Sequence, residues 1–366
     1  MGLKLTNHIA PDLQAPDLQA PDLQVIVPNL NWRYSGVTAT NRMIAPLLAQ
    51  RLNVAWLGFY APDNVARMSW RDLLALLVRR PRAPVIWHAR RNNEMMAGLL
   101  LKALGWPLRP IFTSAGQRHH TWITRFLISR MDAVIAASEA AASYLKRPAT
   151  VILHGIDTAR YAPPADREVA FRATNLPGRY AIGCFGRVRP QKGTDVFVDA
   201  MCRLLPKYPD FTAVIVGAVT PDQQGFNDGL KKQVATAGLS ERVRFLGELP
   251  IDDVPPWYQR VLIYAFTSRN EGFGLTLLEA MASGDALVAA RAGAADKVVV
   301  DGETGFLVPA GDATAMADAL EKLMRNPALA IDMGFKGRER VLAQFSIEAE
   351  ADKIAAVYRD VLNASR

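Results

Sequence analysis

The stretch Leu262–Gly284, LIYAFTSRNEGFGLTLLEAMASG, carries the strongest fold signal in the chain. The apolar run Leu262–Phe266 predicts a buried strand, and the polar residues 267–270 predict a short loop after it. Glu271-Gly-Phe-Gly then leads into a helix that we expect to begin near Leu275. Glycines let the backbone approach a ligand closely, and a helix N-terminus offers free N–H groups to an anion. The stretch therefore predicts a strand–loop–helix unit that binds an anionic group.

Two carboxylates frame this glycine turn. Glu271 lies in the loop, where it can reach a sugar hydroxyl, and Glu279 lies about one turn into the helix, where it can accept hydrogen bonds from a ribose. The alternative is that Gly272 and Gly274 only form a tight turn and that both glutamates are solvated.

A second motif, Gly183–Gly193 (GCFGRVRPQKG), runs from the end of the predicted strand Tyr180–Phe185 into the loop after it. Within it, Arg187 offers a planar fork of donors and Lys192 a mobile point charge, a pair that suits a diphosphate leaving group. The alternative is a surface loop with incidental basic residues. The functional interpretation is favoured because both loops would meet at one edge of one parallel sheet.

Strands and helices alternate along the chain on both sides of Asp157–Gly178, a segment rich in Pro and charge that we expect to be a linker. Such alternation predicts parallel sheets covered by helices on both faces. The predicted fold class is α/β, with two Rossmann-like doubly wound domains facing across a cleft at the carboxyl ends of the strands. The expected strands are Gln24–Pro28, Val54–Gly58, Val85–His88, Pro110–Ser114, Ala133–Ala136 and Thr150–Leu153, then Tyr180–Phe185, Ala213–Val216, Val243–Leu246, Leu262–Phe266, Ala286–Ala289 and Gly305–Val308. The expected helices include Val37–Leu52, Asn92–Leu104, Thr121–Arg130 and Ile347–Leu362.

We expect four parts along the chain. Residues 1–22 form an irregular extension, because 10–24 are three copies of Ala-Pro-Asp-Leu-Gln, whose five-residue period fits neither helix nor strand. Residues 23–165 form the N-terminal domain and 166–345 the C-terminal domain. Residues 346–366 form an amphipathic helix, whose return to the first domain is left open.

Composition narrows the class of protein. Half of the 366 residues are apolar, which is enough for two buried cores. The net charge of +8 is uneven, because residues 1–170 hold 20 Lys and Arg against 11 Asp and Glu, whereas the remainder holds 23 against 24. A basic half indicates an anionic partner, such as a membrane surface or a nucleic acid, or else only a solvated basic surface. The two cysteines lack metal-ligand spacing, and no secretory signal or apolar run of membrane-spanning length is visible, so we expect a cytoplasmic protein.

In order and spacing, these motifs resemble the large retaining glycosyltransferase family 4. The resemblance rests on Gly186-Arg187…Lys192-Gly193 and, about 85 residues later, on Glu271-(seven residues)-Glu279. Further matching segments are Val216-Gly217, Arg242–Gly247, Glu279–Gly284 and Asp301–Gly305. The match covers about residues 150–345. It implies the fold called GT-B, a sugar nucleotide in the cleft and retention of configuration at the anomeric carbon.

The resemblance also implies roles for individual residues. It assigns Glu271 to the transferred sugar, Glu279 to the ribose, and Arg187 with Lys192 to the diphosphate. It implies no metal or other cofactor, and no Asp-x-Asp at a strand end is visible here. The implied donor-binding set is Gly36, Gly186, Arg187, Lys192, Phe273, Gly274, Leu275 and Glu279.

The first half departs from the family pattern. Gly36 is placed like the family's first glycine loop, but the usual Gly-Gly pair is reduced to this one glycine. Family members often carry a His at the end of a mid-domain strand, and the corresponding strand Pro110–Ser114 has none. His119 and His120 follow within about a turn. Either one of them takes the catalytic role, or both are surface residues. The usual Pro after Ser283-Gly284 is also missing, because Asp285 stands there.

A narrower resemblance is to mannosyltransferases of lipopolysaccharide core assembly in Gram-negative bacteria. It rests on Pro28–Asn31, Gly36–Thr38, Thr113–Arg118 and Met131–Ile135. It implies GDP-mannose as the donor and an anionic lipid-linked glycan as the acceptor, with peripheral contact at the inner membrane. The candidate contacts for the acceptor or the membrane are Arg79, Arg80, Arg82, Arg90 and Arg91.

Two alternatives stay open. One keeps the fold but uses another sugar nucleotide, such as UDP-glucose, or another glycan acceptor. The other is a nucleic-acid-binding protein attracted by the basic half. The second is disfavoured because no recognised nucleic-acid motif is present and the arginines are interleaved with buried segments.

Overall fold

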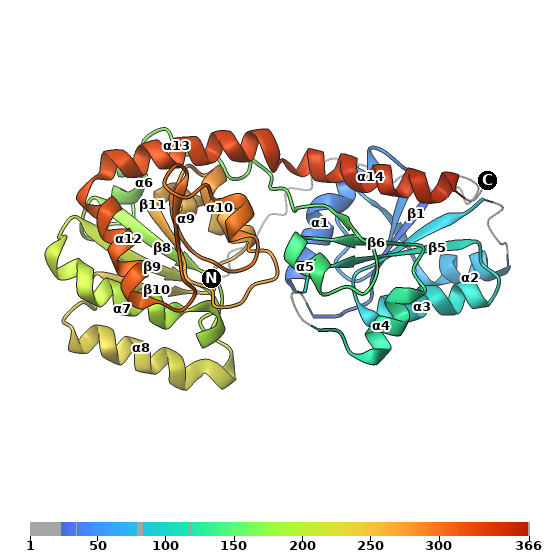
Figure 1. Cartoon of the computed structure of the whole chain (residues 1–366), viewed down its shortest axis with the longest axis horizontal. Helices are drawn as coiled ribbons and strands as arrows, with labels where there is room; N and C mark the ends of the chain where they lie inside the picture. Colours follow the sequence, from blue (N-terminus) through green and yellow to red (C-terminus); the bar gives the residue numbers. More distant parts are fainter. Residues whose placement is uncertain (1–22, 34, 79–82, 117–118, 365–366) are drawn as a thin grey trace, which may run out of the picture. The chain divides into compact units, whose positions relative to one another are not determined.

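The computed structural model describes residues 23–33, 35–78, 83–116 and 119–364. These residues form two compact units, each built from a parallel sheet with helices packed on it (Figure 1). The first unit comprises the described residues of 1–113, 121–135 and 351–366, and the second those of 114–120 and 136–350. The long continuous segment of the second unit therefore begins at Ala136 and ends at Glu350. From Ala351 onward the C-terminal helix belongs to the first unit.

Within the described residues, the first sheet has seven strands in the order β3-β2-β1-β4-β5-β6-β7. Because β1 pairs in parallel with both β2 and β4, the strand order reverses at this point. The central strands are continuous apolar runs, as expected of a parallel sheet covered on both faces. The strands are β1 (Val25–Asn29), β2 (Val54–Gly58), β3 (Ala66–Met68), β4 (Val85–Ala89), β5 (Leu108–Ser114), β6 (Ala133–Ala136) and β7 (Thr150–Val151).

The helices between these strands are α1 (Gly36–Ala49), α2 (Trp70–Val78), α3 (Asn92–Ala103), α4 (Trp122–Ser129) and α5 (Glu139–Ser143). The last helix, α14 (Ile347–Asn363), belongs to the first unit from Ala351 onward. Its buried Tyr358 Oη lies 2.5 Å from Nδ1 of the buried His88 in β4. The C-terminal helix therefore returns to the first unit.

Within the described residues, the second sheet has six strands in the order β10-β9-β8-β11-β12-β13, and neighbouring strands pair in parallel. The order reverses between β8 and β11, which makes the carboxyl ends of these two strands the switch point where ligands bind in such folds. The strands are β8 (Tyr180–Phe185), β9 (Phe211–Val216), β10 (Val243–Gly247), β11 (Val261–Phe266), β12 (Ala286–Ala290) and β13 (Gly305–Val308).

Helices with apolar inner faces cover this sheet and form its core with Phe197, Met201, Leu320 and Met333, among others. They are α6 (Arg167–Arg172), α7 (Thr194–Leu204), α8 (Gln224–Thr236), α9 (Val254–Arg260), α10 (Leu275–Ala282), α11 (Ala295–Val298), α12 (Ala313–Arg325) and α13 (Pro327–Gln344). Short 3-10 turns are η2 (Pro190–Lys192), η3 (Leu205–Lys207) and η4 (Pro221–Gln223).

The expected linker contains the helix α6, which the sequence pattern did not predict. Arg167 at its start forms an ion pair with the buried Asp285, at 2.5 Å. The same guanidinium donates to the carbonyl oxygens of Ser283, at 2.7 Å, and Gly284, at 3.1 Å. Asp285, which stands where the family usually has Pro, is thus the partner that anchors α6 to the start of β12.

Candidate active site

The loops that follow β8 and β11 touch each other at the switch point of the second sheet. Gly193, at the start of α7, has a φ of 68°, and a Cβ there would lie 2.0 Å from the carbonyl oxygen of Thr267. Only glycine tolerates both this left-handed conformation and this close approach. Thr267 Oγ1 also donates to the Lys192 carbonyl oxygen, at 2.9 Å. The two glycine-containing sequence motifs therefore form one site.

Lys192 and Glu271 are the charged pair at the centre of this site. Lys192 Nζ forms an ion pair with Glu271 Oε2, and Ser268 Oγ donates to the same oxygen at 3.4 Å. The two side chains are 24% and 20% exposed, so a ligand can reach them while they are partly sheltered from water. The structure thus brings together the residue predicted to contact the diphosphate and the residue predicted to contact the sugar.

Arg187 presents its guanidinium to solvent from a fixed backbone. The preceding N–H of Gly186 donates to the Val216 carbonyl at 2.8 Å, and the following N–H of Val188 donates to the Ala218 carbonyl at 3.0 Å. The side chain is exposed and forms no ion pair with any residue that the structure describes. Its five N–H donors are therefore available to an anion.

The glycine turn ahead of α10 has the geometry of an anion-binding helix start. Gly274 has a φ of 96° and occupies the N-cap, and no side chain caps the helix, which begins at Leu275 as predicted. Phe273 is buried, and its carbonyl oxygen accepts from Ala294 N at 2.8 Å. The first N–H groups of the helix point outward along the axis, where the helix dipole favours a negative charge.

Glu279 is held by two tyrosines. Its Oε1 accepts a hydrogen bond from Tyr161 Oη at 3.2 Å, and its Oε2 accepts one from Tyr258 Oη at 2.7 Å. Burial raises the pKa of Glu279, and the hydrogen bonds from the two hydroxyls oppose this rise. The carboxylate is thus fixed in one orientation, with lone pairs left for a further donor such as a ribose hydroxyl.

The sequence motifs did not identify these tyrosines. Tyr161 lies in the expected linker, 118 positions before Glu279, and Tyr258 lies 21 positions before it on α9. No local period relates either residue to the motif, so only the tertiary fold reveals the contact.

His154 is a further buried residue beside the glycine turn. Its Nδ1 lies 2.8 Å from Glu350 Oε1, and the N–H of Gly155 donates to Glu350 Oε2 at 2.8 Å. The imidazole meets the ring of Phe273 edge-on, with centroids 5.0 Å apart. His154 thus supports the buried side of the turn.

Arg91 lies inside the first unit. Its guanidinium donates to Asn29 Oδ1 at 2.7 Å, to Glu94 Oε1 at 2.9 Å, and to both Ser35 Oγ and Thr38 Oγ1 at 2.9 Å. These bonds join the end of β1 to the N-cap of α1, beside Gly36. In this structure Arg91 holds the first glycine loop, and its contact with the acceptor stays a prediction.

The other residues that the sequence predicted to bind the donor, the acceptor or the membrane in the first half of the chain are Gly36, Arg90, Arg79, Arg80 and Arg82. Among the described residues, no atom beyond its chain neighbours and the helix backbone lies within 4 Å of the position that a Cβ on Gly36 would occupy, so these residues leave space at the start of α1. Arg90 is half-buried, and its N–H donates to Glu94 Oε2 at 2.8 Å. Arg79, Arg80 and Arg82 lie outside the described residues.

The two candidate catalytic histidines differ in exposure. His119 is exposed and meets the ring of Tyr144 edge-on at 5.1 Å, whereas His120 is half-buried. These surroundings do not show which histidine is catalytic, so the catalytic role of either one stays a prediction. The end of β5 instead carries Thr113, whose Oγ1 lies 2.7 Å from Nε2 of the buried His88.

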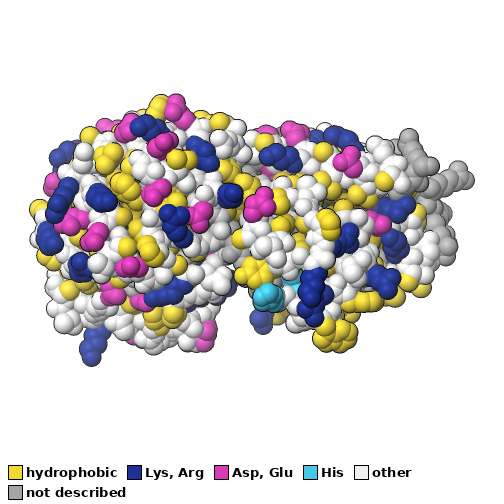
Figure 2. All heavy atoms as spheres, viewed as in Figure 1, with side chains coloured by type: hydrophobic (Ala, Val, Ile, Leu, Met, Phe, Trp, Pro, Cys, Tyr) yellow, Lys and Arg dark blue, Asp and Glu magenta, His cyan; other side chains and the backbone are white. Residues whose placement is uncertain are grey.

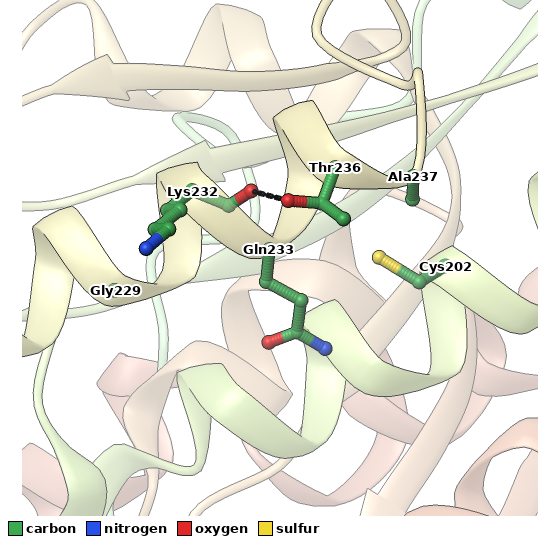
Figure 3. A pocket seen from close by; sticks show the side chains of 6 residues that line it. All are labelled: Cys202, Gly229, Lys232, Gln233, Thr236 and Ala237. Carbon is green, nitrogen blue, oxygen red and sulfur yellow. Dashed lines mark hydrogen bonds between the residues drawn. The ribbon is translucent and has the colours of Figure 1, made fainter.

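A hollow of about 440 Å³ lies elsewhere on the second unit, between α7 and α8 (Figure 3). Its lining is Cys202, Gly229, Lys232, Gln233, Thr236 and Ala237. None of these residues belongs to the switch point, so this hollow is not the candidate site. No group of three or more His, Cys, Asp or Glu suited to a metal ion occurs among the described residues. No helix within the described ranges is long and apolar enough to cross a membrane.

The fold matches that of proteins whose structures have been solved. The Anabaena protein HepE, solved in complex with UDP and glucose, is 19% identical and gives a TM-score of 0.79, covering 92% of this chain and 100% of that one. The predicted GT-B architecture, an α/β fold with two parallel sheets, is therefore confirmed.

Sequence relatives place the chain within this class. Residues 166–340 match the family model of glycosyl transferases group 1. The lipopolysaccharide core biosynthesis mannosyltransferase LpcC of Rhizobium leguminosarum bv. viciae is 48% identical over 347 residues, covering 93% of this chain and 97% of that protein. The solved C-terminal domain of the group 1 glycosyl transferase LpcC from Francisella tularensis is 38% identical, with a TM-score of 0.52, covering 53% of this chain and 100% of that domain. The chain belongs to the glycosyl transferases group 1 family and is a glycosyltransferase.

Proposed function

We propose that this enzyme transfers mannose from GDP-mannose to a lipopolysaccharide core precursor, with retention at the anomeric carbon. The observation that carries the proposal is the Lys192–Glu271 ion pair at the carboxyl ends of β8 and β11, which sets a cation for a diphosphate beside a carboxylate for a sugar. The identity of 48% to a mannosyltransferase of lipopolysaccharide core synthesis supports the choice of sugar and acceptor.

The leaving diphosphate is the group that the basic residues would serve. Lys192 is paired with Glu271, whereas the exposed Arg187 has no ion-pair partner among the described residues. A bound diphosphate would draw Lys192 toward itself and add Arg187 as a second, bidentate contact. Both contacts strengthen as negative charge grows on the leaving group, so they lower the barrier rather than only the dissociation constant.

The acidic residues and the helix start would hold the remaining parts of the donor. Glu271 would face the transferred sugar, and Glu279, fixed by its tyrosines, would accept from the ribose. The uncapped start of α10 at Gly274 and Leu275 would receive the phosphate oxygens.

Turnover without a metal or other cofactor is part of the proposal. Arg187 and Lys192 together supply two positive charges at the place where the diphosphate departs. Activity is therefore expected to survive excess EDTA, and a complete loss that magnesium or manganese restores would contradict this part.

The proposed location is the cytoplasmic face of the inner membrane, with peripheral attachment. The acceptor would be an anionic lipid-linked glycan, which agrees with the excess of Lys and Arg in residues 1–170, 20 against 11 Asp and Glu.

A second candidate keeps the chemistry but changes the donor. HepE was solved in complex with UDP and glucose, which makes UDP-glucose the rival donor to test.

A donor screen decides between the candidates. The full chain is incubated with GDP-mannose, UDP-glucose or UDP-galactose and with lipopolysaccharide core lacking the outer sugars, and the released nucleoside diphosphate and the extended acceptor are measured. We expect acceptor-dependent release of GDP only. Acceptor-dependent release of UDP would establish the second candidate, and the absence of acceptor-dependent release from all three donors would exclude both.

A further inference from the structure

Three consecutive helices of the first unit, α2, α3 and α4, cover the same face of its sheet. The connections β3–α2–β4, β4–α3–β5 and β5–α4–β6 all step in one direction along the strand order. Because such crossovers are right-handed, helices that step in the same direction lie on the same face. The helix α1 steps the opposite way, from β1 to β2, and therefore lies on the other face.

This layer exposes an unusual amount of apolar surface. The described residues include sixteen exposed large apolar side chains, and eight of them lie on these three helices or at the end of α3. They are Trp70 and Leu74 on α2, Met96, Leu100 and Leu104 along α3, and Trp122, Ile123 and Phe126 on α4. We call these eight residues the apolar face. On each helix the exposed residues recur at intervals of four, apart from Ile123, and therefore lie on one side of the helix.

The outward side of α4 shows the pattern most clearly. Its buried residues are Thr124, Leu127 and Ile128, which leaves Trp122 and Phe126 facing away from the sheet, at 71% and 52% exposure. The guanidinium of Arg130 stacks over the ring of Phe126 at 5.2 Å. Figure 2 shows yellow side chains gathered at the lower edge of this unit, where Figure 1 labels α4, with Lys and Arg beside them.

The charged side chains around the apolar face that lack an ion-pair partner among the described residues are mainly positive. Arg71, Arg125 and Arg130 are exposed and form no ion pair with any described residue. The acidic residues of the layer are engaged instead. Glu94 pairs with Arg91, Asp132 pairs with both Lys102 and Arg109, and Asp72 accepts from Ser69 N. The layer therefore offers cations that lack partners and few acids that could attract cations.

We propose that the apolar face is the surface by which this enzyme lies on an anionic lipid bilayer. Tryptophan, phenylalanine and leucine side chains would enter the boundary between head groups and acyl chains, as in other interfacial helices. Arginines at their edges would meet lipid phosphates while their stems lie along apolar groups. The proposal deepens the proposed function and rests on it, because a lipid-linked acceptor would be met at this surface.

A second copy of the chain fits this surface less well. A symmetric dimer joins the same patch of both subunits, so Arg71, Arg125 and Arg130 would face their own equivalents with no free acids to pair them. An anionic bilayer supplies the missing negative charge, which is why we commit to lipid as the partner.

Vesicle binding of the full chain, without donor or acceptor, tests the proposal. The vesicles are phosphatidylethanolamine with about a third of phosphatidylglycerol, and pure phosphatidylcholine for comparison. We expect Trp122→Ser with Phe126→Ser, and separately Trp70→Ser with Leu74→Ser, to lower the partition coefficient on anionic vesicles at least tenfold. The matched control is Ile331→Ser with Phe335→Ser, on α13 of the other unit, which removes side chains of 59% and 63% exposure at the same spacing and should change binding less than twofold.

The charge contribution is tested in the same assay. Arg125→Gln with Arg130→Gln should weaken binding to anionic vesicles at low salt by about fivefold per arginine, and the loss should shrink at high salt. The control Lys231→Gln with Lys232→Gln removes two exposed cations of α8 and should leave binding almost unchanged.

Three outcomes overturn the proposal. One is equal binding by the wild type and both serine pairs on the apolar face. Another is an equal loss in the α13 control. The third is a dimer in light scattering that the serine pairs dissociate while vesicle binding is unchanged, since the face is then a contact between copies. Donor turnover, measured separately without vesicles, keeps a failure of this proposal distinct from a failure of the proposed function.

Discussion

Lys192 and Glu271 neutralise each other when no donor is present, which explains how two charges can stand half-buried at one point. In the proposed function the ion pair would also link donor binding to catalysis, because a diphosphate that takes Lys192 would leave Glu271 free to face the sugar. Glu279 is fixed independently of this pair, by Tyr161 and Tyr258. We therefore expect the two glutamates to have separable tasks.

The basic pair should act mainly on turnover. Arg187→Ala or Lys192→Ala removes a contact that strengthens as the leaving group gains charge, a loss of typically about 3–4 kcal/mol in the barrier. We expect turnover to fall on the order of a hundredfold or more, with the thermal midpoint unchanged. Lys207→Ala, at an exposed site of the same unit, is the control and should be silent. Near-normal turnover of either site variant would remove that residue from the site.

The two glutamates should separate turnover from binding. Glu271→Gln keeps the shape but removes the charge that stabilises the flattened, positively charged sugar, so turnover should fall strongly while GDP binding is nearly unchanged. Glu279→Gln should weaken GDP binding with a smaller effect on turnover, because the ribose lies far from the bond that breaks. Calorimetry with GDP and steady-state kinetics measure the two effects. Loss of GDP binding only in Glu271→Gln would reverse the assignments.

Tyr258 should set the pH range in which Glu279 binds the nucleotide. Burial already raises the pKa of Glu279, and the Tyr258 hydroxyl opposes the rise, so Tyr258→Phe should raise this pKa further. Loss of a hydrogen bond to a charged group corresponds to roughly a tenfold weaker affinity for GDP. The difference in GDP affinity between Tyr258→Phe and the wild type should widen as the pH falls from 8 to 6, because a smaller fraction of Glu279 is then ionised in the variant. Tyr264→Phe, whose hydroxyl donates to the Phe185 carbonyl at 3.2 Å, is the matched control, and an identical pH profile of both variants would refute the role of Tyr258.

Strands and helices could be predicted at the scale of elements because parallel strands buried on both faces read as continuous apolar runs, as in VIVPN of β1 and VLIYAF of β11. The meeting of Lys192 and Glu271 was also predictable, since each follows a strand at a reversal of strand order. The helix α6 was not, because its six residues are too short to show a period. The hydrogen bonds of Arg91 were not predictable either, since a sequence shows an arginine but not the acceptors that the fold places around it.

The ion pair that anchors α6 should be important for stability. Arg167→Ala leaves the buried Asp285 without its partner, which should lower the free energy of unfolding by about 3–5 kcal/mol at pH 7. Burial raises the pKa of Asp285 and Arg167 opposes this, so the variant should recover stability as the pH falls and Asp285 takes a proton. Arg167→Ala with Asp285→Ala should be less destabilised than Arg167→Ala alone. Urea unfolding measures these differences, with Arg179→Ala at an exposed pair expected to cost less than about 1 kcal/mol.

At the scale of the whole molecule, α14 belongs to the first unit although the second unit precedes it in the sequence. The contact between His88 and Tyr358 joins positions 270 residues apart, and Arg51 and Asp352 add a more exposed ion pair at 2.6 Å. The final helix is thus part of the first unit's core, with Ala351, Ile354, Ala355 and Tyr358 all buried. Stability of this unit therefore depends on a helix that lies far along the chain from the strands of its sheet.

His88 should make this stability depend on pH. Burial lowers its pKa well below the usual value, and the nearby Arg90 adds to the effect, so the folded protein keeps the imidazole neutral between Tyr358 and Thr113. The unfolded chain binds a proton there near pH 6.5, so below that pH the unfolded state holds more protons and the free energy of unfolding should fall by about 1.4 kcal/mol per pH unit. Urea unfolding between pH 7.5 and 5.5 should show this slope, and His88→Asn should lack it, whereas His119→Ala at the exposed site should keep it. If His88→Asn does not fold, the ring resonances of the wild type decide instead, since a His88 that titrates near pH 6.5 in the folded protein would contradict the neutral, buried state.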